Sequence, residues 1–170
     1  RVANLLKNRS DVLQNLTDSK LKVYFTKDED LGGDSSGFTT GYAYYTTGET
    51  SQYEAHFVLS AFYGGLFDGN DGDTVDIHET LHILDFRDTA VEGLPYGINT
   101  STATTFKSAR DALFSTYNQT KTSVGAIRKY GFTNNEEFLA VASENFYERP
   151  TELKTTSASL YSSLAEYFSV

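Results

Sequence analysis

The 170-residue sequence contains no cysteine. Disulfide frameworks, thiolate metal sites and cysteine nucleophiles are therefore excluded. Any metal ion bound by this chain has to be held by histidine and carboxylate side chains. The absence of cysteine does not define the compartment, because cysteine-free domains occur both in secreted enzymes and in the cytosol.

Long apolar segments and positive charge are also scarce. No run approaches the roughly 20 apolar residues that cross a bilayer, so we expect no membrane partner. The formal net charge is −9, which disfavours nucleic acid as a partner because phosphate binding calls for basic patches. The length fits one domain, spanning 1–170, that buries a core of its own. We expect this domain to be a monomer.

The start of the chain carries no recognisable targeting segment. It begins with Arg1 rather than methionine, and nothing there reads as a signal peptide. We therefore expect a processed form or a fragment of a secreted or exported protein, with a cytoplasmic location as the alternative.

The spacing of apolar residues predicts a small sheet early in the chain and helices later. Asp73 is expected to cap one helix, and Pro150 to end another. The order of elements predicts an α+β fold. The expected helices cover about 1–18, 73–86, 104–117, 124–130, 134–148 and 157–168, and the expected strands cover 21–26, 38–45 and 53–62.

The motif that carries chemistry is His78-Glu79-Thr80-Leu81-His82, an HExxH pattern. Residues four apart lie on one face of a helix, so both imidazoles can point at one metal ion. Glu79 lies about 100° around the helix from His78, beside the metal, where it can take a proton from water. Only three histidines occur in the chain, and two fall in this pattern. The alternative is a pair of core histidines bonded to backbone or carboxylate groups.

Zinc needs a third protein ligand and an open position. Asp85 follows His82 by three residues, but its short side chain favours a supporting or helix-end role over ligation. In the helix expected over 134–148, Glu137 and Glu144 are seven residues apart and face the same way. Glu137 is therefore the preferred ligand, with Glu136 as its rival. Without the histidine motif, this stripe would be interpreted as a solvated acidic face.

The segments HETLHILDF and KYGFTNNEEFLAVASENF resemble a group of gluzincins. The group contains the catalytic domain of anthrax lethal factor, the Pro-Pro endopeptidases and the MtfA peptidases. Tyr130 precedes Glu137 by seven residues, as in that group, and Asp85 also matches. The segment from Glu137 to Glu144 is particularly similar to the MtfA pattern. The resemblance is strong over about 73–86 and 130–150.

The resemblance implies a zincin-like metallopeptidase fold, with a small N-terminal sheet, an active-site helix and a helical C-terminal half. It implies one zinc ion held by His78, His82 and Glu137, with Glu79 as the base. It also implies that Tyr130 donates its hydroxyl to the oxyanion of the tetrahedral intermediate, an interaction worth about 3 kcal/mol where it occurs. We expect Asp85 and Glu144 to contact the metal ligands without binding the metal themselves.

Two weaker patterns have structural and functional interpretations. His56 lies in an expected strand and is interpreted first as an exposed strand histidine; the alternative is that a peptide substrate extends this strand and His56 lines a subsite. The loop Asp68–Asp73 resembles a calcium loop by composition, but lacks glycine at the sixth position of an EF-hand and is typical of a solvated turn.

These observations predict a zinc-dependent endopeptidase whose partner is a peptide or protein substrate. In that function, a metal-activated water attacks the peptide bond while Glu79 accepts and returns the proton. The alternative is a regulatory or partner-binding protein on a metallopeptidase frame, with weak or no peptidase activity. The intact motif, Glu137 and Tyr130 favour the enzyme.

Overall fold

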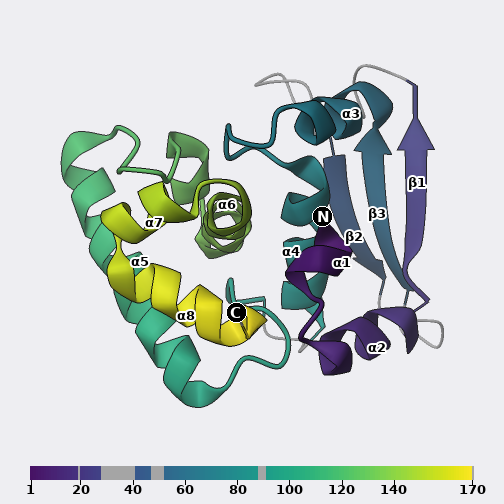
Figure 1. The fold of residues 1–170 in the computed structure, drawn as a ribbon, viewed down its shortest axis with the longest axis horizontal. Helices are drawn as coiled ribbons and strands as arrows, with labels where there is room; N and C mark the ends of the chain where they lie inside the picture. Colours follow the sequence, from purple (N-terminus) through teal and green to yellow (C-terminus); the bar gives the residue numbers. More distant parts are fainter. Residues whose placement is uncertain (19, 28–40, 47–51, 88–90, 170) are drawn as a thin grey trace.

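The computed structural model describes residues 1–18, 20–27, 41–46, 52–87 and 91–169. Figure 1 shows a sheet with short helices, built from the first half of the chain, beside a helical part built from the second half. Helix α4 (Val75–Phe86) and helix α6 (Asn135–Glu148) pack against each other where the two parts meet. The fold is mixed α+β, as the sequence predicts. No helix in the described part of the chain is long and apolar enough to cross a membrane.

The first expected helix is divided into α1 (Val2–Leu5) and α2 (Ser10–Asp18). Arg9 lies at the break and donates hydrogen bonds to the carbonyl oxygens of Tyr167 and Gly97, far along the chain. These contacts with the C-terminal half favour a bend that local periodicity does not encode.

The sheet has three described strands in the order β1-β3-β2. β1 (Lys22–Thr26) runs parallel to the central strand β3 (Gln52–Val58), and β2 (Gly41–Thr46) runs antiparallel to it. On β3 the buried Tyr53, Ala55 and Phe57 alternate with Glu54 and His56. The buried face therefore packs toward α4, and the other face carries the polar residues. The first residues of the strand expected over 38–45 lie outside the described residues.

The strand expected over 53–62 is wrong in its second half, where the chain turns into helix α3 (Leu59–Phe67). The aromatic residues of this segment favoured a strand. In the structure Phe62 packs against Phe25 and Phe57, with ring centroids 5.1 and 5.7 Å away, from its place on the helix. Packing against the end of the sheet thus decides the local conformation.

Helix α4 is buried along nearly its whole length between the sheet and α6. Its N-cap is Thr74 rather than the expected Asp73. Asp73 instead forms an ion pair with Arg128, 3.1 Å away. The Asp73 carboxylate is thus directed to Arg128 and not to the helix end.

The helical half contains α5 (Thr100–Thr120), α6, α7 (Pro150–Thr156), α8 (Ala158–Phe168) and a 3₁₀ turn, η1 (Lys129–Phe132). α5 is longer than expected because Asn99 caps it by accepting the N–H of Thr102. The helix expected over 124–130 is wrong: Val124 and Ile127 form a bridged turn. Pro150 ends α6 as expected but also starts α7, where its missing N–H costs nothing.

One loop joins α4 to α6 through a buried carboxylate. Asp85 at the end of α4 accepts the N–H groups of Glu92, Gly93 and Leu94 at 3.0–3.3 Å. Gly93 has φ +71°, and a Cβ there would meet the carbonyl oxygen of Asn135 at 2.2 Å. The loop thus packs directly against the first turn of α6.

We expect Gly93→Ala to lower the free energy of unfolding by about 3 kcal/mol, because it adds left-handed strain and a backbone clash. Denaturant unfolding measures the change. The matched control is Gly64→Ala in α3, where an added Cβ has no neighbour within 4 Å; it should be neutral or stabilising by about 0.5–1 kcal/mol. Equal stability of the two variants would contradict the seating of the loop.

Candidate metal site

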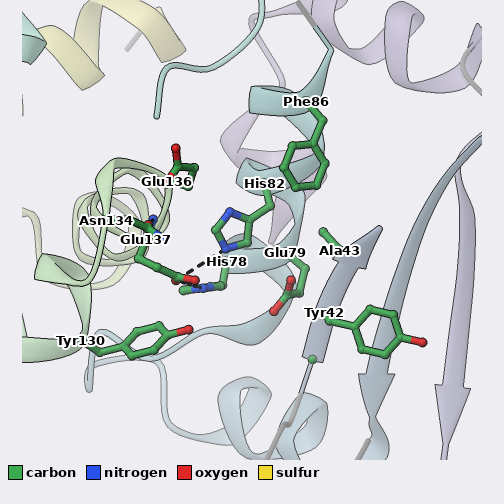
Figure 2. Close-up of a pocket in the computed structure, with 11 residues that line it drawn as sticks. Tyr42, Ala43, His78, Glu79, His82, Phe86, Tyr130, Asn134, Glu136 and Glu137 are labelled. Carbon is green, nitrogen blue, oxygen red and sulfur yellow. Dashed lines mark hydrogen bonds and ion pairs between the residues drawn. The ribbon is translucent and has the colours of Figure 1, made fainter. Parts of the chain in front are cut away.

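Helix α4 places the two histidines of the motif on its face toward α6. His78 and His82 are buried, and their ring centroids are 4.8 Å apart with the rings nearly perpendicular. Figure 2 shows both imidazoles directed toward Glu137. The four-residue spacing therefore converges on one point, as helical geometry requires.

Glu137 reaches this point from the first turn of α6. Asn134 caps that helix and accepts the N–H of Glu137 at 2.7 Å, which fixes the turn. The Glu137 Oε2 atom lies 2.9 Å from Nε2 of His78 and 3.5 Å from Nε2 of His82. One donor atom from each of the three residues lies within 4.8 Å of the others.

The rival carboxylates lie elsewhere. Glu136 lines the neighbouring cavity, and Figure 2 draws its carboxylate away from the histidines. Asp85 is occupied by the backbone N–H groups of the loop that follows α4. Among the described residues, the group that can hold a metal ion is His78, His82 and Glu137.

Glu144 holds the other nitrogen of His78. Its Oε1 atom lies 2.9 Å from Nδ1 of His78, and its side chain is fully buried. An ionised carboxylate only accepts hydrogen bonds, so Nδ1 is the donor and Nε2 faces Glu137. Glu137 and Glu144 do face the same way, and the expected alternative of a solvated acidic face does not apply to them.

The carboxylates change the protonation of the site. Burial alone would lower the pKa of His78, but hydrogen bonds with Glu137 and Glu144 outweigh it and raise that pKa to about 10. Burial would raise the pKa of Glu137, but the two histidines hold it well below its usual range. A metal ion that binds Nε2 of His78 has to displace a proton, so metal affinity falls as the pH falls.

Glu79 is buried beside the histidines and points into the cavity. Burial raises its pKa, an effect that His78 and His82 partly oppose. Strand β2 lies directly against it: a Cβ on Gly41 would come within 3.0 Å of the Glu79 carboxylate and 2.5 Å of Val75. Glycine at this position therefore allows the strand to approach the carboxylate.

Tyr130 enters the site from η1. Its ring centroid lies 5.9 Å from that of His78, and Figure 2 shows its hydroxyl directed toward His78 and Glu137. Burial and the nearby Glu137 carboxylate raise the pKa of the phenol, which is therefore a proton donor at neutral pH. Half of the residue remains exposed.

These side chains border an open cavity of about 440 Å³. Its remaining walls include Gly41, Tyr42 and Ala43 of β2 and Phe86 of α4. His56 is not among the described lining residues; it lies between the rings of Tyr24 and Tyr42, at 4.5 and 4.3 Å, on the outer face of the sheet. The alternative interpretation of His56 as a subsite residue is therefore not supported, and the central strand β3 is already paired on both sides.

The loop Asp68–Asp73 is held by hydrogen bonds of its last residues. Gly72 (φ +72°) donates its N–H to Glu148 at 3.0 Å, and Asp73 donates its own to Asp71. These contacts fix the approach to α4.

The residues present fit a metal ion by donor chemistry. Two imidazole nitrogens and one carboxylate oxygen converge beside an open cavity, and the second nitrogen of His78 is held by a buried carboxylate. Three protein ligands with an open position are typical of catalytic rather than structural sites.

Sequence reasoning missed two contributors to this site. Arg128 lies beside Glu144, with its NH2 group 3.4 Å from Oε1; a lone arginine in a loop gives no signal in one sequence. The β2 edge lines the cavity, but the sequence cannot tell an edge strand from a central one.

A helix carrying His-Glu-x-x-His, with a carboxylate from a second helix beside both histidines, is the arrangement typical of metallopeptidases. The chain belongs to the glucose-regulated metallopeptidase M90 family, whose model matches residues 24–169. It is also similar to the Synechocystis sp. protein slr2042, with 32% identity over 103 residues. That alignment covers 58% of this chain and 36% of the relative, so the chain spans about a third of that protein's length.

We expect Glu137→Ala to lose metal, because two histidines alone leave the site one ligand short. Glu136→Ala, one residue away and outside the donor group, should keep full metal content. Metal analysis of both purified variants, with melting curves to verify folding, measures the difference. Full metal content in Glu137→Ala, or loss of metal in Glu136→Ala, would show that the third ligand is not Glu137.

Proposed function

We propose that this chain is a zinc-dependent endopeptidase with a zincin-like fold. The observation that carries the proposal is the convergence of His78, His82 and Glu137 beside a cavity into which Glu79 points. Two imidazoles and one carboxylate with an open position form a donor set that suits zinc. When bound there, zinc would supply a Lewis acid that polarises the scissile carbonyl and acidifies water.

In this proposal Glu79 moves the proton. Burial raises the pKa of Glu79 towards neutral pH. A base with such a pKa both accepts and returns a proton efficiently. Glu79 takes a proton from the attacking water and delivers it to the leaving amine. Gly41 lets β2 pass close to this carboxylate, because a Cβ at that position would come within 3.0 Å of it.

Tyr130 is the proposed hydroxyl donor. Its phenol stays protonated and points into the site, so it can donate to the carbonyl oxygen of the substrate as negative charge develops there. Glu144 and Asp85 act without touching the substrate. Glu144 orients His78, and Asp85 fixes the loop beneath α6.

A peptide substrate has a natural place along β2. This strand is at the edge of the described sheet and also borders the cavity through Gly41, Tyr42 and Ala43. An extended peptide can pair with an edge strand through its main chain. Such pairing would lay the scissile bond beside Glu79 and the histidines. We therefore assign the substrate to β2 and not to β3, the strand considered in the alternative interpretation of His56.

The test is digestion of a peptide library by the zinc-loaded protein, with and without a chelator. We expect internal cleavage that the chelator abolishes. Glu79→Gln should keep its zinc and its fold but lose hydrolysis by about 10³-fold, because the amide cannot accept the proton. Hydrolysis by Glu79→Gln at the normal rate would contradict the mechanism. Absence of cleavage by the unmodified protein would favour a partner-binding role.

Tyr130→Phe removes one hydroxyl and leaves the ring in place. If the hydroxyl acts mainly in the transition state, kcat should fall about 10²-fold with KM and the melting temperature nearly unchanged. Tyr167→Phe is the control, because this buried phenol donates to the carbonyl oxygen of Tyr96 at 3.0 Å. That variant should lose about 1 kcal/mol of stability but no kcat per folded molecule. Reduced stability with normal kcat in Tyr130→Phe would make Tyr130 a packing residue.

A further inference from the structure

The guanidinium of Arg128 joins three segments of the chain around the site. Its NH1 group donates to the carbonyl oxygen of Gly72 at 2.6 Å and to Oε2 of Glu144. Its NH2 group lies 3.1 Å from Oδ1 of Asp73 and 3.4 Å from Oε1 of Glu144. Its Cζ atom lies 5.8 Å from the centre of the Tyr130 ring.

Glu144 depends on this contact. Its side chain is fully buried, and a buried carboxylate is costly unless it is paired and hydrogen-bonded. Among the described residues, Glu144 contacts Nδ1 of His78 and the Arg128 guanidinium. The planar guanidinium can bind both carboxylate oxygens, which also fixes the direction in which Glu144 faces His78.

Arg128 also contacts Tyr130 and the segment that leads into α4. It is the residue before η1, so it precedes Tyr130 by two positions, and its side chain lies over that ring. Its bonds to Gly72 and Asp73 tie the segment just before α4 to the same point. The Asp73 carboxylate is largely exposed, so Glu144 and the Gly72 carbonyl carry most of this effect.

We propose that Arg128 is a positioning residue, which orients His78 through Glu144 and places Tyr130 relative to it. The proposal rests on the metal site of the proposed function, and it assigns Arg128 no contact with substrate. If Arg128 acted only through its charge, its removal would raise the metal affinity, because a cation near the site repels the metal ion. If Arg128 positions His78, its removal lowers the metal affinity. The direction of the change in metal affinity therefore separates the two.

Arg9 provides a matched control. It also bridges a carboxylate, Asp11, at 2.8 Å, donates to two backbone carbonyls, and lies 4.4 Å from the centre of a tyrosine ring, that of Tyr167. These contacts join α2 to the end of α8 and involve none of the site residues. Losing Arg9 therefore removes the same kinds of interaction without disturbing His78.

The experiment titrates zinc into the metal-free full chain against a competing chelator. Arg128→Gln should weaken zinc binding at least about tenfold, as loss of outer-sphere partners does. Arg128→Lys should show most of this loss, because one ammonium cannot form the fork by which NH1 and NH2 contact both oxygens of Glu144. Arg9→Gln should bind zinc as the unmodified protein does. Melting curves establish that each variant is folded, and Arg128→Lys preserves the buried charge balance if Arg128→Gln does not fold.

A second readout needs neither metal nor activity. The His78 Nδ1–H proton donated to Glu144 should be visible by NMR in the metal-free protein and protected from solvent exchange. In the Arg128 variants its exchange should become at least about tenfold faster, and in Arg9→Gln it should not change. Unchanged or tighter zinc binding with unchanged protection in a folded Arg128 variant would overturn the proposal.

The outcomes also separate this proposal from the proposed function. If the unmodified protein binds zinc but cuts no peptide, the peptidase proposal fails while the zinc titrations still decide the role of Arg128. If it binds no zinc, the metal site fails, and the exchange of the His78 proton decides whether Arg128 positions that ring.

Discussion

The imidazole of His78 is held on both sides by carboxylates of α6, and this double contact fixes α4 against α6. Glu137 contacts Nε2 and Glu144 contacts Nδ1, each at 2.9 Å. The two carboxylates lie seven residues apart on a helix that is buried along most of its length, largely by apolar side chains. Charges in such surroundings are tolerated only in mutual contact. The polar groups that give the site its chemistry thus also fix the registry of the two central helices.

The sequence predicts the chemistry of the site better than its surroundings. A four-residue histidine spacing and a seven-residue carboxylate spacing are properties of any helix, so each pair can be placed on one helix face from the sequence alone. The need for a third metal ligand and the resemblance to gluzincins then relate the two pairs. The α+β order follows in the same way from apolar periodicity. The structure places all four as that geometry requires.

What the sequence could not predict depends on contacts between distant segments. The turn from β3 into α3 follows from the packing of Phe62 on Phe25 and Phe57, and the break before α2 accompanies the bonds of Arg9 to Tyr167 and Gly97. Asp73 serves Arg128 rather than capping α4. Apart from Phe57, these partners are distant in sequence, and periodicity carries no information about them. The position of β2 at the sheet edge is likewise a property of the assembled sheet.

The cavity has two walls of different character. One is formed by the first turn of α6 and by α4, whose residues are almost all interior, so a substitution on α4 disturbs the core as well as the site. The other is a thin edge strand that meets the site mainly through backbone and small residues, while the side chains of Tyr42 and Tyr44 are exposed. We therefore expect substitutions to be tolerated better on the strand than on the helical wall. Relatives can diverge along the strand, and so in what they recognise, while the reactive groups opposite stay constrained by the packing of the protein itself.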